Sequence, residues 1–98
     1  LMASGAAGII SAVSNIVPDK MAALCNAVFA NDYTAARRLA RTLYPLCKNC
    51  FVESNPIPVK EALAQMGLIS NELRLPLTSA TAATADIIEN TLKNLDLL

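Results

Sequence analysis

Apolar side chains recur along most of this chain at the three- and four-residue spacing of amphipathic helices. Pro18 suits the first position of a helix, and one apolar face follows it. Asn31 and Asp32 interrupt the pattern, and Asp32 suits the N-cap of a second helix, which we expect to be the longest. The apolar positions of the two helices are Met21, Leu24, Cys25, Val28 and Phe29, then Ala36, Leu39, Leu43, Leu46 and Cys50.

A stiff corner is predicted after the second helix, in the stretch FVESNPIPVKEAL. Pro56 and Pro58 fix two φ angles and bias the residues before them toward extended conformations. A third helix is expected to start at Val59 and to end at Gly67. The chain must therefore leave the second helix and turn before the third begins.

A last helix is predicted after the LRLPL stretch, with Thr78 or Ser79 as its cap. Its apolar face is formed by Ile87, Ile88, Thr91, Leu92 and Leu95. The sequence therefore predicts four helices in its last eighty residues or so.

The first apolar run, AGIISAVSN, differs from the helices in being short and in pairing two β-branched residues, Ile9 and Ile10. A buried strand over Gly8 to Val13 is predicted, although so short a run also fits a helix. The fold class expected from the pattern is mainly α, with one strand before about four helices.

The composition adds an expectation about partners. The 98 residues are 54% hydrophobic and 16% charged, against a charged fraction of about 25% in soluble domains. No stretch approaches the roughly 20 apolar residues of a membrane span, so the excess apolar surface is expected to meet other protein. Eight basic and eight acidic residues are spread without runs, which predicts neither nucleic acid nor a membrane as partner.

The N-terminal residues lack the basic flank of a secretory signal, and a cytoplasmic location is expected.

Cys47 and Cys50 form a CKNC motif that invites a metal or redox interpretation. Three cysteines and no histidine cannot complete a four-ligand zinc site unless a carboxylate joins. The pair lies near the end of a predicted helix, where the dipole opposes a thiolate. We interpret the cysteines as structural and expect no metal.

Glu53 and Lys60 flank the proline corner, where a catalytic acid or a Schiff-base lysine is conceivable. A nucleophilic lysine must be desolvated or crowded by cations, whereas Lys60 precedes Glu61 at the start of a helix. A solvated or ion-paired role is the expected one.

Arg37, Arg38 and Arg41 of the second helix could clamp a phosphate. No glycine-rich loop lies beside them, and a solvated face is the more frequent role of such arginines. Because the chain has no histidine, the usual general base of a hydrolytic triad is absent.

Several stretches together resemble the C-terminal third of the dihydrodipicolinate synthase family. They are GAAGIISAVSNIVPDKMAALC, LYPL, FVESNPIPVKEALAQMGL and LRLPL. The most specific is FVESNPIPVKEAL, because NPIPVK distinguishes this family from its pyruvate-lyase relatives. The stretch TSATAATADII departs from the more charged sequences typical of the family.

The resemblance implies a (β/α)₈ TIM barrel followed by a helical C-terminal domain, in a cytoplasmic homotetramer. It assigns residues 1–17 to the end of a barrel helix and the eighth barrel strand. Residues 18–98 would form the last barrel helix and the C-terminal helical domain.

The resemblance also implies a lyase of lysine and diaminopimelate biosynthesis. Such an enzyme condenses pyruvate with aspartate semialdehyde to 4-hydroxy-tetrahydrodipicolinate through a Schiff-base lysine, without a metal or organic cofactor. The catalytic lysine of the family lies upstream of the residues printed here, so this chain is expected to have no catalytic residue and to be an inactive fragment. None of its lysines matches that position: Lys20, Lys48, Lys60 and Lys93.

Ile10 is the one substrate-binding position that the resemblance carries over, because its backbone would line the pyruvate pocket at the end of the strand. A plain barrel-core role for Ile10 is left open. Two other functions are also left open, namely a related pyruvate aldolase and a stand-alone helical interaction module.

Overall fold

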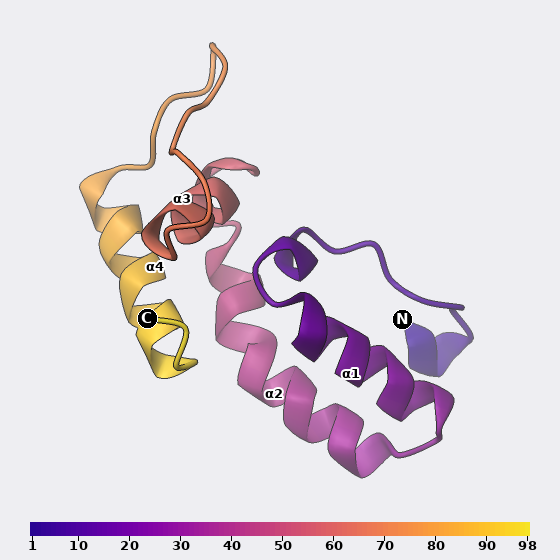
Figure 1. Ribbon diagram of the computed structural model, residues 1–98. Coiled ribbons are helices and arrows are strands. Elements are labelled where there is room, and N and C mark those ends of the chain that lie inside the picture. The colour runs from indigo at the N-terminus through magenta and orange to yellow at the C-terminus, as the bar shows by residue number, and fades with distance from the viewer.

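The computed structural model describes residues 1–98 and consists of helices joined by loops, with no strand (Figure 1). The 3-10 helices are η1 (Met2–Ser4) and η2 (Ala12–Asn15), and the α-helices are α1 (Pro18–Phe29), α2 (Tyr33–Asn49), α3 (Ile57–Gln65) and α4 (Ala82–Asn94). The mainly α class and the four helices predicted from the sequence are confirmed.

The signals that separate the first two helices act as predicted. α1 begins at Pro18, and Asn31 adopts a left-handed φ of 57° after the helix has ended. The Asp32 carboxylate then caps α2 by accepting a hydrogen bond from the Ala35 N–H at 3.1 Å. α2 is the longest helix, with 17 residues.

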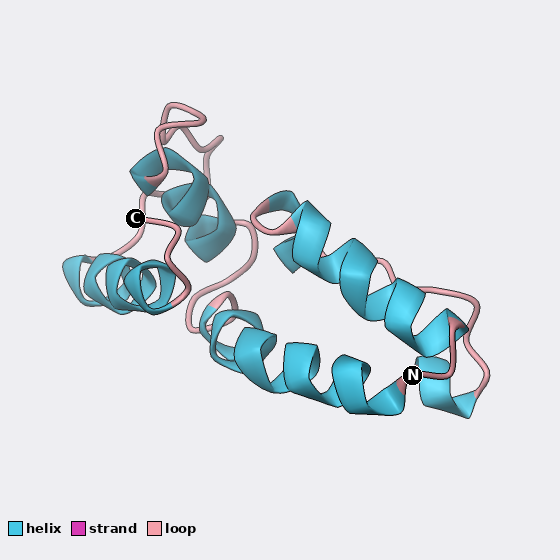
Figure 2. Cartoon of the chain, turned by 60° about the horizontal axis from the view of Figure 1, so that its bottom comes forward, coloured by secondary structure: helices cyan, strands magenta, loops and turns pink.

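The helices pack as two pairs. α1 and α2 form an antiparallel hairpin, and α3 and α4 pack together beyond its end, where α4 also contacts α2 (Figures 1 and 2). Side chains from η2 and all four helices meet in one core. Its eleven buried residues are Val13, Ile16, Val17, Met21, Leu43, Leu46, Cys50, Val59, Ala62, Ile88 and Leu92.

The apolar faces predicted from the spacing are covered unevenly. Leu43, Leu46 and Cys50 of α2 are buried as expected, whereas Phe29 at the end of α1 is 61% exposed. Pro45 lies inside α2, between the apolar positions that predicted the helix. Because proline lacks an N–H group, the Arg41 carbonyl has no hydrogen-bond donor at the position four residues on.

α3 starts two residues earlier than predicted. Ile57 is its first residue although it precedes Pro58, which disfavours helical backbone there. The Ile57 side chain is only 7% exposed, and its N–H donates to the Ser54 carbonyl at 2.9 Å, so burial and this bond outweigh the local bias. The predicted end is confirmed, since Gly67 has a φ of +75° just beyond the helix.

The predicted caps of the last helix, Thr78 and Ser79, were wrong. Thr81 caps α4 by accepting a hydrogen bond from the Thr84 N–H at 3.2 Å. The Thr81 N–H in turn donates to the Glu53 carboxylate at 3.0 Å, a contact across 28 positions that spacing along the chain cannot show.

The strand predicted over Gly8 to Val13 does not form in this chain. Ser11 has extended angles, but residues 12–15 coil into η2, and no other segment pairs with residues 7–10. A strand needs a neighbouring strand for its backbone groups, and the chain offers none. The alternative helical interpretation holds for the second half of this run, where Val13 is buried in the core.

None of the helices combines the length and the apolar character needed to cross a membrane.

Candidate functional site

The segment of residues 7–10, which carries the predicted site residue Ile10, has no regular secondary structure and leads at its C-terminal end into η2. At that end the Ser11 hydroxyl accepts a hydrogen bond from the Val13 N–H at 3.2 Å, and the Ser14 hydroxyl donates to the Ser11 carbonyl. The backbone N–H and C=O groups of residues 7–10 make no hydrogen bond within the chain. These groups are free to pair with other protein or to face a ligand.

The two isoleucines of this segment face different surroundings. Ile9 lines a pocket against the helices and is 37% exposed, whereas Ile10 is fully exposed, at 108% of its reference area. The two neighbouring side chains therefore differ in how much the rest of the chain covers them. Ile10 therefore lies on the face of the segment that the rest of the chain leaves uncovered.

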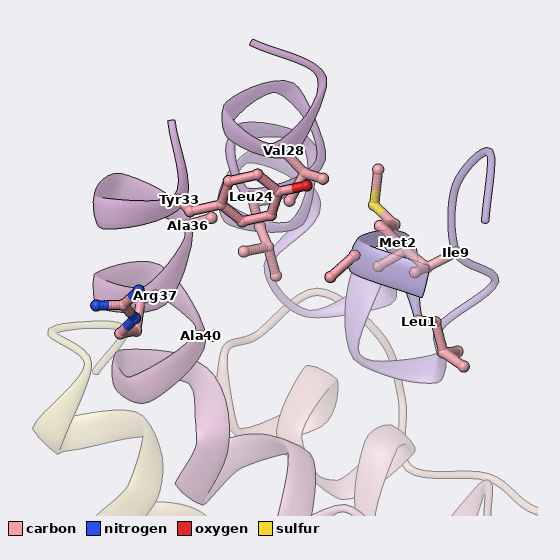
Figure 3. A pocket seen from close by; sticks show the side chains of 10 residues that line it. Leu1, Met2, Ile9, Leu24, Val28, Tyr33, Ala36, Arg37 and Ala40 are labelled. Atoms are coloured by element: carbon pink, nitrogen blue, oxygen red, sulfur yellow. The ribbon is translucent and has the colours of Figure 1, made fainter. Parts of the chain in front are cut away.

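The pocket beside Ile9 separates the N-terminal segment from the hairpin of α1 and α2 and has a volume of about 290 Å³. In Figure 3, Leu1, Met2 and Ile9 lie on one side and the side chains of α1 and α2 on the other. The lining residues are Leu1, Met2, Ala3, Ile9, Leu24, Val28, Tyr33, Ala36, Arg37 and Ala40. The tyrosine and the arginine carry its only polar side-chain groups, and no carboxylate, histidine or lysine lines it, so the pocket offers mainly apolar surface and no general acid–base pair.

The lysines do not provide a nucleophile in this pocket. The Lys60 ammonium donates to the Glu72 carbonyl, and Lys93 forms an ion pair with Glu89 at 2.6 Å. Lys20 and Lys48 lie on helix surfaces outside the pocket lining. A solvated or ion-paired role was expected for Lys60, and its ammonium is bonded to a backbone carbonyl at the surface without forming an ion pair.

Glu53 joins the proline corner to α4. Its carboxylate accepts hydrogen bonds from the N–H and the hydroxyl of Thr81, at 3.0 and 3.4 Å. Hydrogen bonding from the Thr84 side chain and the Thr81 backbone holds the pKa of this carboxyl below its usual value. A general acid needs a raised pKa, so Glu53 is suited to hold the helix start and not to donate a proton.

The cysteines of the CKNC motif are poor nucleophiles. Burial, with a smaller contribution from Cys47, raises the pKa of the Cys50 thiol to about 11. Burial also raises the pKa of Cys47. Both thiols are therefore protonated at neutral pH, which supports their interpretation as structural residues. No group of three or more histidine, cysteine, aspartate or glutamate side chains is arranged to hold a metal ion.

The structure therefore brings together a segment without internal backbone pairing, the exposed Ile10 and an apolar pocket, all where the N-terminal residues lie beside α1 and α2. Glu53 and Lys60 at the proline corner lie elsewhere and bond the start of α4 and the loop after α3. The pocket was not visible in the sequence, because its lining combines residues 1–9 with two helices. The unpaired backbone of residues 7–10 and the exposed Ile10 form a surface that other protein can cover.

The sequence matches the model of the dihydrodipicolinate synthetase family over residues 1–95. The protein called 4-hydroxy-tetrahydrodipicolinate synthase from Thermotoga maritima is 48% identical over all 98 residues, which are 33% of that protein. The enzyme of the same name from Methanocaldococcus jannaschii is 44% identical over the whole chain, which covers 34% of it. The chain thus spans about a third of the length of these relatives.

Solved structures of related proteins also match nearly the whole chain to about a third of their own length. The crystal structure of dihydrodipicolinate synthase from Thermotoga maritima matches 99% of this chain and 33% of its own, with a TM-score of 0.97 and 47% identity. The Acinetobacter baumannii enzyme, described as complexed with pyruvate, matches 100% of this chain and 34% of its own, with a TM-score of 0.96 and 41% identity. Because the matches include residues 1–17, the N-terminal segment lies against the helices here as it does in those longer chains.

Proposed function

The chain belongs to the dihydrodipicolinate synthetase family, and from this premise we propose that it forms the C-terminal part of a 4-hydroxy-tetrahydrodipicolinate synthase. The complete enzyme would be a lyase that condenses pyruvate with aspartate semialdehyde, working as a cytoplasmic homotetramer. The observation that carries the proposal is the fit of nearly the whole chain to one third of the Thermotoga maritima enzyme at a TM-score of 0.97.

The free segment supports this role for the N-terminal residues. In the proposed enzyme, residues 1–17 form the end of a barrel helix and the eighth barrel strand, with a strand on each side. Pairing on both sides would satisfy the backbone groups of residues 7–10, which have no partner within the chain. Residues 18–98 would then provide the last barrel helix and the C-terminal helical domain.

Ile10 is proposed to contribute to the pyruvate pocket through its backbone. Active sites of TIM barrels lie at the carboxyl ends of the strands, and Ile10 is near the end of this segment, just before the turn at Ser11. Its side chain lies on the uncovered face of the segment. The pyruvate complex of the Acinetobacter baumannii relative supports pyruvate as the substrate class.

The chemistry itself would be carried by a lysine outside this chain. A lysine that attacks the pyruvate carbonyl forms a Schiff base, and the derived enamine adds to the aldehyde. Such a lysine must be desolvated or crowded by cations, whereas Lys60 and Lys93 have hydrogen-bond or ion-pair partners and Lys48 is exposed. These 98 residues would supply one wall of the pocket and the packing that supports it.

The proposal is tested by grafting the 98 residues in place of the matching third of the Thermotoga maritima enzyme. The chimera is expected to consume pyruvate and aspartate semialdehyde and to trap pyruvate covalently on borohydride reduction. The chain alone should do neither.

A pyruvyl adduct on Lys20, Lys48, Lys60 or Lys93 of the chain alone would contradict this division of roles. A folded chimera without activity would count against the lyase assignment. Turnover of pyruvate with another aldehyde, but not with aspartate semialdehyde, would instead indicate a related pyruvate aldolase.

A further inference from the structure

α2 carries three arginines on its surface that have no carboxylate partner. Arg37, Arg38 and Arg41 are all exposed, and the chain's ion pair lies elsewhere, between Lys93 and Glu89. These arginines and two threonines form the whole lining of a surface hollow of about 360 Å³. The lining is Thr34, Arg37, Arg38, Arg41 and Thr42.

The positions of the arginines along α2 place like charges next to one another. Arg37 and Arg41 are four residues apart, and Arg38 and Arg41 are three apart, so each pair shares one side of the helix. Like charges at these spacings destabilise a helix, whereas an opposite charge between them stabilises it. The nearest acid along the chain, Asp32, uses its carboxylate to cap the helix. The repulsion within α2 is therefore not compensated within the chain.

We propose that this hollow binds a small multivalent oxyanion, of the phosphate or polycarboxylate class. Guanidinium groups present planar forks of N–H donors that match the oxygens of phosphates and carboxylates. The Thr34 hydroxyl adds a neutral hydrogen-bonding group to the lining, whereas the Thr42 hydroxyl donates to the Arg38 carbonyl at 3.0 Å. A concave site of this size accommodates a small molecule better than the flat face of another protein. The site does not depend on the lyase activity proposed above.

The lining of the hollow limits which anion can bind there. Arg37 lines both the hollow and the apolar pocket, at the edge of the latter that is farthest from Met2 in Figure 3. The remaining lining of the hollow is wholly polar. A compact anion without a large apolar group is therefore the ligand that the hollow fits.

The test titrates the 98-residue chain with pyrophosphate and with citrate, following ³¹P and ¹³C line widths of the probes and the Nε–Hε signals of the arginines. Sodium acetate at matched ionic strength is the monovalent control. Both multivalent anions are expected to bind about tenfold more tightly than acetate, because they engage more than one guanidinium. The affinity should fall as salt is added.

Arg38→Gln and Arg74→Gln form a matched pair of variants. Each removes one exposed arginine, but Arg74 lies on the loop after α3, outside the hollow. Arg38→Gln should weaken pyrophosphate binding about fivefold or more, and Arg74→Gln less than twofold. Arg38→Lys should fall between them, because lysine keeps the charge and loses the fork.

Equal weakening by the two Gln variants would show attraction by net charge alone and would overturn the proposal. Equal affinity for acetate and pyrophosphate, or no binding of either multivalent probe, would overturn it as well. Circular dichroism of each variant checks that α2 remains helical, and the Arg38→Lys variant provides the comparison if Arg38→Gln loses helix.

Discussion

Two side chains, those of Glu53 and Thr81, decide where α4 begins. Glu53, in the proline corner, bonds the N–H and hydroxyl of Thr81, and Thr81 caps α4. A carboxylate near a helix N-terminus also interacts favourably with the helix dipole. One residue thus connects the corner after α2 to the start of a helix 28 residues later.

Stability is expected to depend on the charge of Glu53. Its pKa is lowered in the folded chain from the usual 4.5, so its contribution is complete above pH 4.5 and is lost as the pH falls through the folded pKa. Glu53→Gln should therefore lower the urea midpoint at pH 7 and lower it less as the pH falls below 4.5, for example at pH 3. Glu72→Gln is the control, since its side chain is exposed and makes no hydrogen bond, whereas only its backbone groups are bonded. An equal loss for Glu53→Gln at both pH values would contradict the prediction.

At the scale of elements, two helices have a proline in their first turn, in different surroundings. Pro18 begins α1 and is exposed, whereas Pro58 lies in the first turn of α3 and is fully buried. Both fix a helical φ angle before folding. Only Pro58 also contributes its ring to the packing between the corner and the core.

Replacing each proline with alanine should separate these two effects. Pro18→Ala is expected to lower the free energy of unfolding by about 0.5–1 kcal/mol, through greater freedom of the unfolded chain. Pro58→Ala should cost about 2 kcal/mol, because buried methylene groups are lost in addition. Urea unfolding measures both. Equal losses would show that the buried ring adds nothing to the packing.

At the scale of the whole molecule, the chain leaves apolar surface and backbone unpaired at one end. Residues 7–10 have no internal hydrogen bonds, and Ile10 is fully exposed beside them. Apolar side chains are also exposed far from this segment, among them Phe51, Leu68 and Leu75. Such a surface favours association with other protein.

The isolated chain is therefore expected to self-associate as its concentration rises in sedimentation experiments. In dilute solution, the amides of Gly8, Ile9 and Ile10 should exchange quickly with solvent, whereas that of Leu46 in the core of α2 should be protected. In the chimera with the Thermotoga maritima enzyme, the three N-terminal amides should become protected by pairing. Protected amides in a monomeric chain would instead favour a self-contained module.

The sequence by itself determined the features that depend on neighbouring residues. Pro18, Asp32 and Gly67 set helix ends through local backbone geometry, and the periodic apolar residues of α2 predicted its buried face. The NPIPVK stretch indicated the family that the comparisons then showed.

Only the tertiary structure decided the features that depend on distant partners. Thr81 became the cap of α4 because Glu53 reaches it, and Ile57 became helical because its side chain is buried. The predicted strand did not form, because β-branched residues favour an extended chain but pairing requires a second strand. The pocket near Ile9 emerged for the same reason, since a cavity between segments is set by how they pack and not by their order in the chain.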